Sequence, residues 1–302
     1  MQKTSRRILR LLPLLVLCAA PADDVGHDGE LCSILPPNDM RIPVRPFSAG
    51  FGITQGEFNA VLDRVQEVYG PIISRRGGVL EIQRKWKDST VNAKAQRITP
   101  RYIIEMFGGL ARHDAITPDG FAVVACHEIG HHLGGAPRKR GRHWASIEGQ
   151  ADYFAPLKCL RRLFKDGDNL DFVSDKKAPP EVMEACSKAH ESPQDRAFCA
   201  RAAMGGLSVA QMFHSFETSK PVPDFATPDP AIVESTRNSW PENQCRLDTY
   251  FAGALCPKPA DAENDYDDPA PGTCTRAEGY AREARPRCWY KPPETILPGL
   301  HL

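Results

Sequence analysis

The chain lacks an excess of charge of either sign, because 38 lysine and arginine residues balance 38 aspartate and glutamate residues. Such a balance does not favour a nucleic-acid partner. The basic run at residues 138–142 lies in a predicted loop, where solvation is its expected role. Contact with acidic groups of a substrate is the alternative for this run.

Two further absences narrow the class of protein. Beyond residue 22 the chain has no apolar run that approaches the about 20 residues of a membrane-spanning helix. It also has no C-x-x-C pair, which argues against a zinc ribbon or a thioredoxin-type site. We therefore expect a globular protein without a transmembrane segment, and the sequence leaves its oligomeric state open.

The beginning of the chain indicates export. Four basic residues precede an apolar run at 11–20, and small residues follow at 20–22, so we predict a secretory signal peptide at 1–22. Lipidation at Cys18 is the alternative, but the bulky Leu17 before it favours simple cleavage. The predicted location is periplasmic or extracellular.

The chain has ten cysteines, and nine remain after the predicted signal peptide. In an oxidising compartment this number predicts disulfides with one thiol left over. We expect the odd thiol to be Cys126, which shares the helical phase of Ile129 and Leu133 and should face the core. The connectivity of the other eight cysteines stays open.

The residues His127-Glu128-Ile129-Gly130-His131 form the pattern H-E-x-x-H. On a helix, histidines four residues apart project from one face and can bind one zinc ion, with the glutamate beside the metal as general base. Thr117 is a good N-cap, Pro118 suits the first helical position and Gly134 suits the end. The sequence therefore predicts a helix whose limits enclose the motif.

Zinc needs a third protein ligand. A histidine six residues after His131 is ruled out because this position holds Pro137. Glu148 and Asp152 are four residues apart and share one face if their segment is helical. Glu148 can complete the metal site, and Asp152 can accept the free ring N–H of a zinc-binding histidine. A solvated acidic face is the alternative for this pair.

H-E-x-x-H followed by E-x-x-A-D resembles the gluzincin metallopeptidases, above all the family of the HtpX heat-shock protease and the CAAX prenyl protease, which has soluble secreted bacterial members. Residues 91–95 resemble its N-A-x-A segment. Near the C-terminus the family carries a histidine-proline pair followed by an arginine. Here Pro241 and Arg246 are kept, and Trp240 stands in the histidine position. In relatives that histidine helps to hold the substrate or the oxyanion, so this role lacks its usual residue here.

The resemblance implies an α+β, mainly helical zincin-like fold with a small antiparallel sheet before the zinc helix. It also implies that an extended substrate pairs by main-chain hydrogen bonds with Asn92 and Ala93, or with the strand near Ile104.

The resemblance further makes Arg246 the candidate donor to the oxyanion of the reaction. An ion pair of Arg246 with Asp152 or Glu148 is an equally weighted alternative. Three other residues are weaker candidates for the donor: His143, Tyr153 and Tyr250.

Periodicity and turn signals predict further elements. Thr54 and Glu57 form a capping box before a helix that runs through Tyr69. The other predicted elements are strands at 79–86, 91–97 and 102–107 and a helix at 145–164.

Residues 23–260 are expected to form the metallopeptidase domain, with a helical insertion or lid of two or three short helices at 165–220. Residues 261–302 are rich in proline and acidic residues, so we expect an irregular tail tied by disulfides.

Together these features predict a secreted or periplasmic zinc-dependent endopeptidase. His127, His131 and Glu148 are its predicted ligands for Zn²⁺, Glu128 is its base, and its substrate is a protein or peptide. One alternative is a non-catalytic zinc-binding assembly or binding protein, which Trp240 favours. The other is a zinc hydrolase that acts on a non-protein amide.

Overall fold

A computed structural model of the chain describes residues 31–44, 52–140, 144–175 and 178–293. The predicted signal peptide, with Cys18, and the candidate donor His143 lie outside these residues. The described part has an α+β fold. None of its helices combines the length and the hydropathy that crossing a membrane requires.

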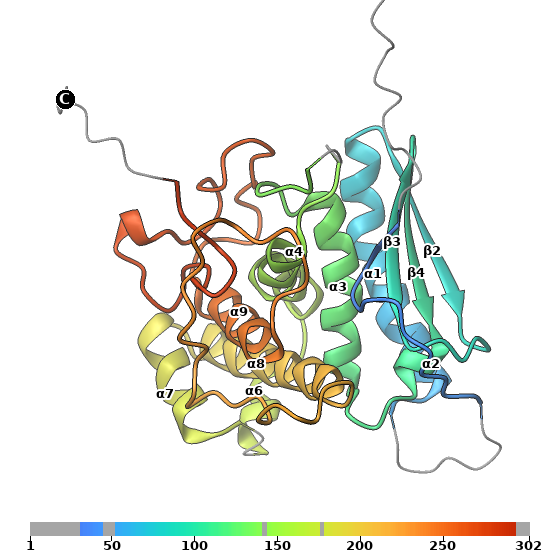
Figure 1. The fold of residues 1–302 in the computed structure, drawn as a ribbon, viewed down its shortest axis with the longest axis horizontal. Coiled ribbons are helices and arrows are strands. Elements are labelled where there is room, and N and C mark those ends of the chain that lie inside the picture. Colours follow the sequence, from blue (N-terminus) through green and yellow to red (C-terminus); the bar gives the residue numbers. More distant parts are fainter. Residues whose placement is uncertain (1–30, 45–51, 141–143, 176–177, 294–302) are drawn as a thin grey trace, which may run out of the picture.

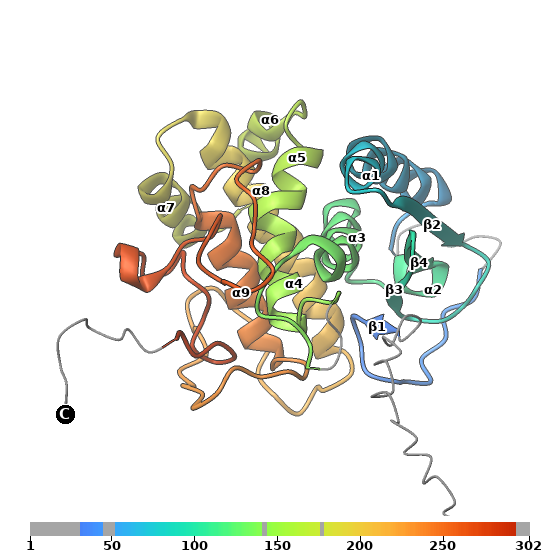
Figure 2. The same ribbon diagram turned by 90° about the horizontal axis from the view of Figure 1, so that it is seen from above.

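Helix α3 (Pro118–Leu133) passes through the middle of the molecule, between the sheet with α1 on one side and α4, α8 and α9 on the other (Figures 1 and 2). Its predicted limits are confirmed. The Thr117 side chain accepts a hydrogen bond from the Gly120 N–H at 3.0 Å, and Gly134 is the C-cap. Every residue from Gly120 to the end of the helix is buried, so the motif lies in the core.

The sheet has the strand order β1-β3-β4-β2, formed by β1 (Cys32–Ser33), β2 (Val79–Lys85), β3 (Ala93–Ile98) and β4 (Arg101–Phe107). The strands predicted before α3 are confirmed. β3 pairs antiparallel with β1 and β4, whereas β2 pairs parallel with β4. The expectation of an antiparallel sheet is therefore wrong. A short turn joins β3 to β4, so these two strands are antiparallel. β2 lies on the other side of β4 and runs parallel to it, and the sheet is therefore mixed.

Helix α1 (Gln55–Arg75) starts at the predicted capping box, where the Glu57 carboxylate accepts from the Thr54 N–H at 2.7 Å. It continues past Tyr69, where the sequence predicts its end, although Pro71 lies inside it. The apolar spacing continues to the buried Ile73. Burial of this side chain contributes about 1.5–3 kcal/mol, which offsets much of the cost of a proline inside a helix.

The second predicted helix begins at Glu148, three residues later than expected. The reason is that Ser146 continues an extended segment along the end of α3, where its N–H donates to the His131 carbonyl at 3.0 Å. From Glu148 the chain stays helical to Leu163, with a π-helical stretch in the middle. The three parts are α4 (Glu148–Phe154), η1 (Ala155–Leu160) and α5 (Arg161–Leu163).

Residues 165–220 contain the short helices α6 (Asn169–Ser174) and α7 (Pro180–Ala189), but also α8 (Pro193–His214), which has 22 residues. The expectation of short helices only is wrong for α8. Its apolar residues belong to the main core with those of α3. A Cβ added at Gly206 would lie 2.6 Å from the Cβ of Tyr250, so small residues bring α8 close to α9. Helix α8 is therefore a core element rather than part of a lid.

Four disulfides cross-link the described residues: Cys126–Cys159, Cys186–Cys199, Cys245–Cys288 and Cys256–Cys274. The expectation that Cys126 is the odd thiol is wrong. It does face the core, but α3 packs there against η1, which carries Cys159. Cys32 is the described cysteine outside these four bonds.

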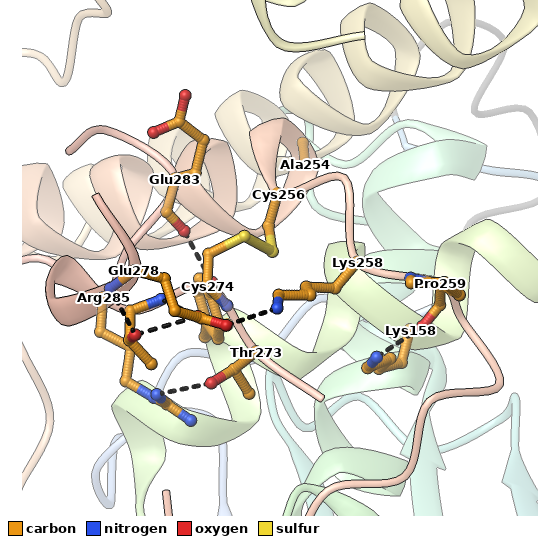
Figure 3. Close-up of a disulfide and its surroundings, with 12 residues drawn as sticks. Lys158, Ala254, Cys256, Lys258, Pro259, Thr273, Cys274, Glu278, Glu283 and Arg285 are labelled. Carbon is orange, nitrogen blue, oxygen red and sulfur yellow. Dashed lines mark hydrogen bonds and ion pairs between the residues drawn. A yellow bond between two sulfur atoms is a disulfide. The ribbon is translucent and has the colours of Figure 1, made fainter. Parts of the chain in front are cut away.

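The chain after α9 (Asn243–Leu255) follows an irregular path across the helical side of the molecule (Figure 1). Figure 3 shows how the Cys256–Cys274 disulfide holds it there. Beside this bond the buried Lys158 ammonium donates to the Pro259 carbonyl at 2.6 Å. The described residues also contain the short helices α2 (Gly108–Ala111) and η2 (Arg276–Glu278).

We predict that Gly130→Val destabilises the fold. A Cβ at Gly130 would lie 2.9 Å from the Cα of Ala151, so α3 and α4 would have to separate. Overpacking of this kind costs about 1–3 kcal/mol, which thermal unfolding would detect as a lower Tm. Gly56→Ala is the control, because its nearest atom lies at 3.8 Å, and it should leave Tm unchanged or raise it. An unchanged Tm for the Gly130 variant would contradict the close helix contact.

Candidate metal centre

Three side chains predicted from the sequence meet at one point. His127 and His131 come from α3, and Glu148 comes from the first turn of α4. The Glu148 Oε2 atom lies 3.3 Å from Nε2 of His127 and 3.7 Å from Nε2 of His131. All three side chains are at most 1% exposed. They form a group that could hold a metal ion.

The geometry of this group fits zinc. Ligand atoms at about 2.0–2.1 Å from a tetrahedral zinc ion lie about 3.3 Å from one another, close to the distances found here. The Nε2 atoms of His127 and His131 and the Oε2 atom of Glu148 are buried and have no hydrogen-bond partner among the described residues. Buried polar atoms are seldom left in this state, and two imidazoles with one carboxylate are a donor set that zinc binds.

The outer nitrogens of both rings are held by hydrogen bonds. Nδ1 of His127 lies 2.7 Å from Oδ1 of Asp152, which confirms the predicted proximity of these two residues. Nδ1 of His131 lies 2.8 Å from the Ser146 carbonyl. Because both acceptors require an N–H at Nδ1, each Nε2 presents its lone pair to the centre of the group.

Glu128 lies next to the ligands on α3 and is completely buried. Neither of its carboxylate oxygens has a hydrogen-bond partner in the described residues. Burial raises the pKa of Glu128 to about 8, against the opposing charge of His127. A carboxylate with such a pKa can take and return a proton near neutral pH.

Lys139 is a site residue that sequence reasoning missed. Its Nζ donates to Oε1 of Glu148 at 2.7 Å, and its side chain is 13% exposed. Burial opposes the charge on Glu148, but His131 and Lys139 hold the pKa of this carboxyl well below its usual range. The expectation of a solvated basic loop is therefore wrong at Lys139. The bridge between Arg138 and Ser146 brings this loop back along the site, and no local sequence signal indicates that pairing.

Arg246 makes the ion pair that was one of its two predicted roles. Its Nη2 donates to Oδ1 of Asp152 at 2.8 Å, and the Tyr250 hydroxyl donates to the same oxygen at 2.6 Å. Its Nη1 donates to the Ile34 carbonyl at 2.8 Å. Tyr153 is not brought into the site, because its hydroxyl donates to the Glu283 carbonyl in the tail.

The residues expected to pair with a substrate are engaged by the chain itself. The Asn92 side chain accepts from the Leu35 N–H and donates to the Leu35 carbonyl, both at 3.2 Å. The Ala93 carbonyl accepts from the Ile34 N–H at 3.2 Å. The strand that contains Ile104 is β4, which lies between β3 and β2. The expectation that a substrate pairs with the strand near Ile104 is wrong, because both sides of β4 are already hydrogen-bonded to other strands.

No family model, curated protein or solved structure matches this chain. The site itself combines three convergent ligand atoms with the buried carboxylate of Glu128, which follows His127 in the chain.

We predict that Asp152→Asn lowers zinc affinity by about 10–100-fold, the usual effect of losing a partner that orients a metal-binding histidine. Competition with a chromogenic chelator would measure this affinity. Asp171→Asn is the matched control, because it changes an exposed carboxylate on α6, and it should leave the affinity unchanged. Equal affinities of both variants would contradict the orienting role of Asp152.

Proposed function

We propose that this protein is a zinc-dependent endopeptidase that works after export from the cytoplasm. The observation that carries the proposal is the burial of Glu128, which follows the candidate ligand His127 in the chain and whose two carboxylate oxygens have no hydrogen-bond partner in the described residues. A site that only stores zinc has no chemical need for this additional carboxylate. The four disulfides are compatible with an oxidising compartment.

In this proposal His127, His131 and Glu148 hold the metal. Zinc, when bound, would polarise the peptide carbonyl and make a water molecule more acidic. Glu128 takes a proton from the attacking water and returns it to the leaving amine. Lys139 holds one oxygen of Glu148 away from the metal, so that the other oxygen serves as ligand.

Arg246 has a double role in the proposal. Through Asp152 it fixes the ring of His127, and its second Nη atom donates to a main-chain carbonyl beside the site. This second donor can bind a carbonyl of the substrate. In this proposal Arg246 is a positioning residue, because it acts on His127 through Asp152. Its Nη1 atom donates to main-chain oxygen and not to a metal ligand.

A second candidate function is zinc binding without catalysis. The observation in its favour is burial, since His127, His131 and Glu128 are all 0% exposed. A reactant needs access to these groups, whereas a stored or structural metal does not.

The decisive variant is Glu128→Gln. Loss of a general base lowers the rate about 10²–10⁴-fold, so we predict that hydrolysis of an unfolded, fluorescently labelled protein falls by this factor while bound zinc stays stoichiometric. Glu184→Gln, an exposed change on α7, is the matched control and should keep full activity.

Two results would contradict the peptidase. Equal hydrolysis by the zinc-loaded protein and its Glu128→Gln variant would point to a contaminating enzyme or to another base. Stoichiometric zinc without hydrolysis of any protein or peptide would favour the non-catalytic zinc protein.

A further inference from the structure

The first described residues form a segment that lies along the candidate metal centre. We call residues 32–36 the N-terminal segment. Its first two residues are β1, and they pair antiparallel with Lys94 and Ala95 of β3. The pairing continues through the Ile34 N–H, which donates to the Ala93 carbonyl. Figure 2 shows β1 beside β3, away from α1.

Residues far from the N-terminal segment in the sequence also bind it. The indole N–H of Trp240 donates to the Ser33 carbonyl at 2.9 Å, and Nη1 of Arg246 donates to the Ile34 carbonyl at 2.8 Å. The Asn92 side chain binds both main-chain polar groups of Leu35. Most of these bonds go to main-chain atoms of the segment, which is how proteins bind an extended peptide independently of its side chains.

This segment also reaches the metal ligands. Cys32 shares a buried apolar cluster with Ala145, whose carbonyl accepts from the Lys139 N–H, and the Lys139 ammonium donates to Glu148. On the other side, Arg246 joins the segment to Asp152 and thereby to His127. Three successive hydrogen bonds therefore connect the segment to His127, through Arg246 and Asp152.

There is room beyond the segment for a longer peptide. A cavity of about 360 Å³ adjoins its end and is lined by Leu35, Pro36, Phe213, Trp240 and Arg246. We call the space that the segment fills the groove; β3 lies on one side of it, Trp240 and Arg246 also contact the segment, and the cavity adjoins its end.

We propose that the N-terminal segment occupies the groove in which an extended peptide substrate binds, so that a peptide enters only after the segment has left. This inference rests on the proposed peptidase function. The substrate would pair with β3, and its carbonyl oxygens would accept from Trp240 and Arg246. The groove would select unfolded chains with an apolar side chain at the place of Ile34, which is completely buried.

A reversible cross-link tests whether the segment must leave. Ser33 and Lys94 lie opposite each other. The Ile34 N–H bonds to the Ala93 carbonyl, so Ile34 and Ala93 are a hydrogen-bonded pair. Hydrogen-bonded and non-hydrogen-bonded pairs alternate along antiparallel strands, so Ser33 and Lys94 are a non-hydrogen-bonded pair. The Cα atoms of such a pair are about 4.5 Å apart, within the range of a disulfide. The test protein is the zinc-loaded full chain with Ser33→Cys, Lys94→Cys and Cys32→Ser, and Cys32→Ser alone is its control.

Binding is measured with a fluorescent peptide that has the sequence of residues 31–37 and carries Cys32→Ser, in a Glu128→Gln background that cannot turn it over. We expect the oxidised double-cysteine protein to bind at least tenfold more weakly than its reduced form. A mild thiol should reverse the effect, since the native disulfides lie in buried positions. Equal binding by the oxidised and reduced forms would overturn the proposal.

Ile34→Ala gives a second test that does not depend on forming the cross-link. It removes buried apolar contact from the segment, so the closed state is weakened and the peptide should bind at least tenfold more tightly. Ile73→Ala makes the same change in the core side of α1 and should not improve binding. Weaker or unchanged binding by the Ile34 variant would mean that the segment is a permanent strand of the sheet.

The outcomes separate this inference from the proposed function. If peptide binding depends on the cross-link but no form with Glu128 hydrolyses peptides, the peptidase proposal fails and the groove assignment stands. If the oxidised, cross-linked protein with Glu128 hydrolyses peptides as fast as its reduced form, the peptidase stands and the groove assignment fails.

Discussion

The candidate site depends on one buried carboxylate oxygen. Oδ1 of Asp152 lies within hydrogen-bond distance of three groups, namely the His127 ring, the Arg246 guanidinium and the Tyr250 hydroxyl. A carboxylate without exposed surface is stable only when charges and donors replace its hydration. Removal of one partner from such a buried pair typically costs about 3–5 kcal/mol. This single atom orients a candidate metal ligand on α3, joins α4 to α9, and through Arg246 holds the N-terminal segment.

The grouping of the candidate metal ligands could be predicted from the sequence because local geometry decides it. The four-residue spacings of His127 with His131 and of Glu148 with Asp152 each place two side chains on one helical face. The pairing of Asp152 with a ligand histidine follows from the chemistry of zinc sites. These predictions hold although the second helix starts later than expected, because Glu148 and Asp152 both lie within α4.

The rest of the site could not be predicted, because it is made by contacts between residues far apart in the chain. Trp240 and Ser33 are separated by 207 residues, and Arg246 and Ile34 by 212. No periodicity or motif encodes such pairs. The same limit explains the errors on Cys126 and on the sheet: the sequence indicates which side of an element is buried, but not which element covers it. Trp240 stands at the sequence position where the resemblance expects a histidine. Its indole N–H is a hydrogen-bond donor there, which the sequence did not indicate.

The placement of the disulfides has a mechanical consequence. Each of the four joins cysteines at or after residue 126, so in the described residues no disulfide crosses from the sheet and α1 to the helical side. The two walls of the groove, β3 and α9, are connected only through the main chain and by non-covalent packing. The four disulfides cross-link residues on the helical side with one another, and none of them joins that side to the sheet. Separation of the two walls would therefore break packing contacts and hydrogen bonds, but none of these four disulfides.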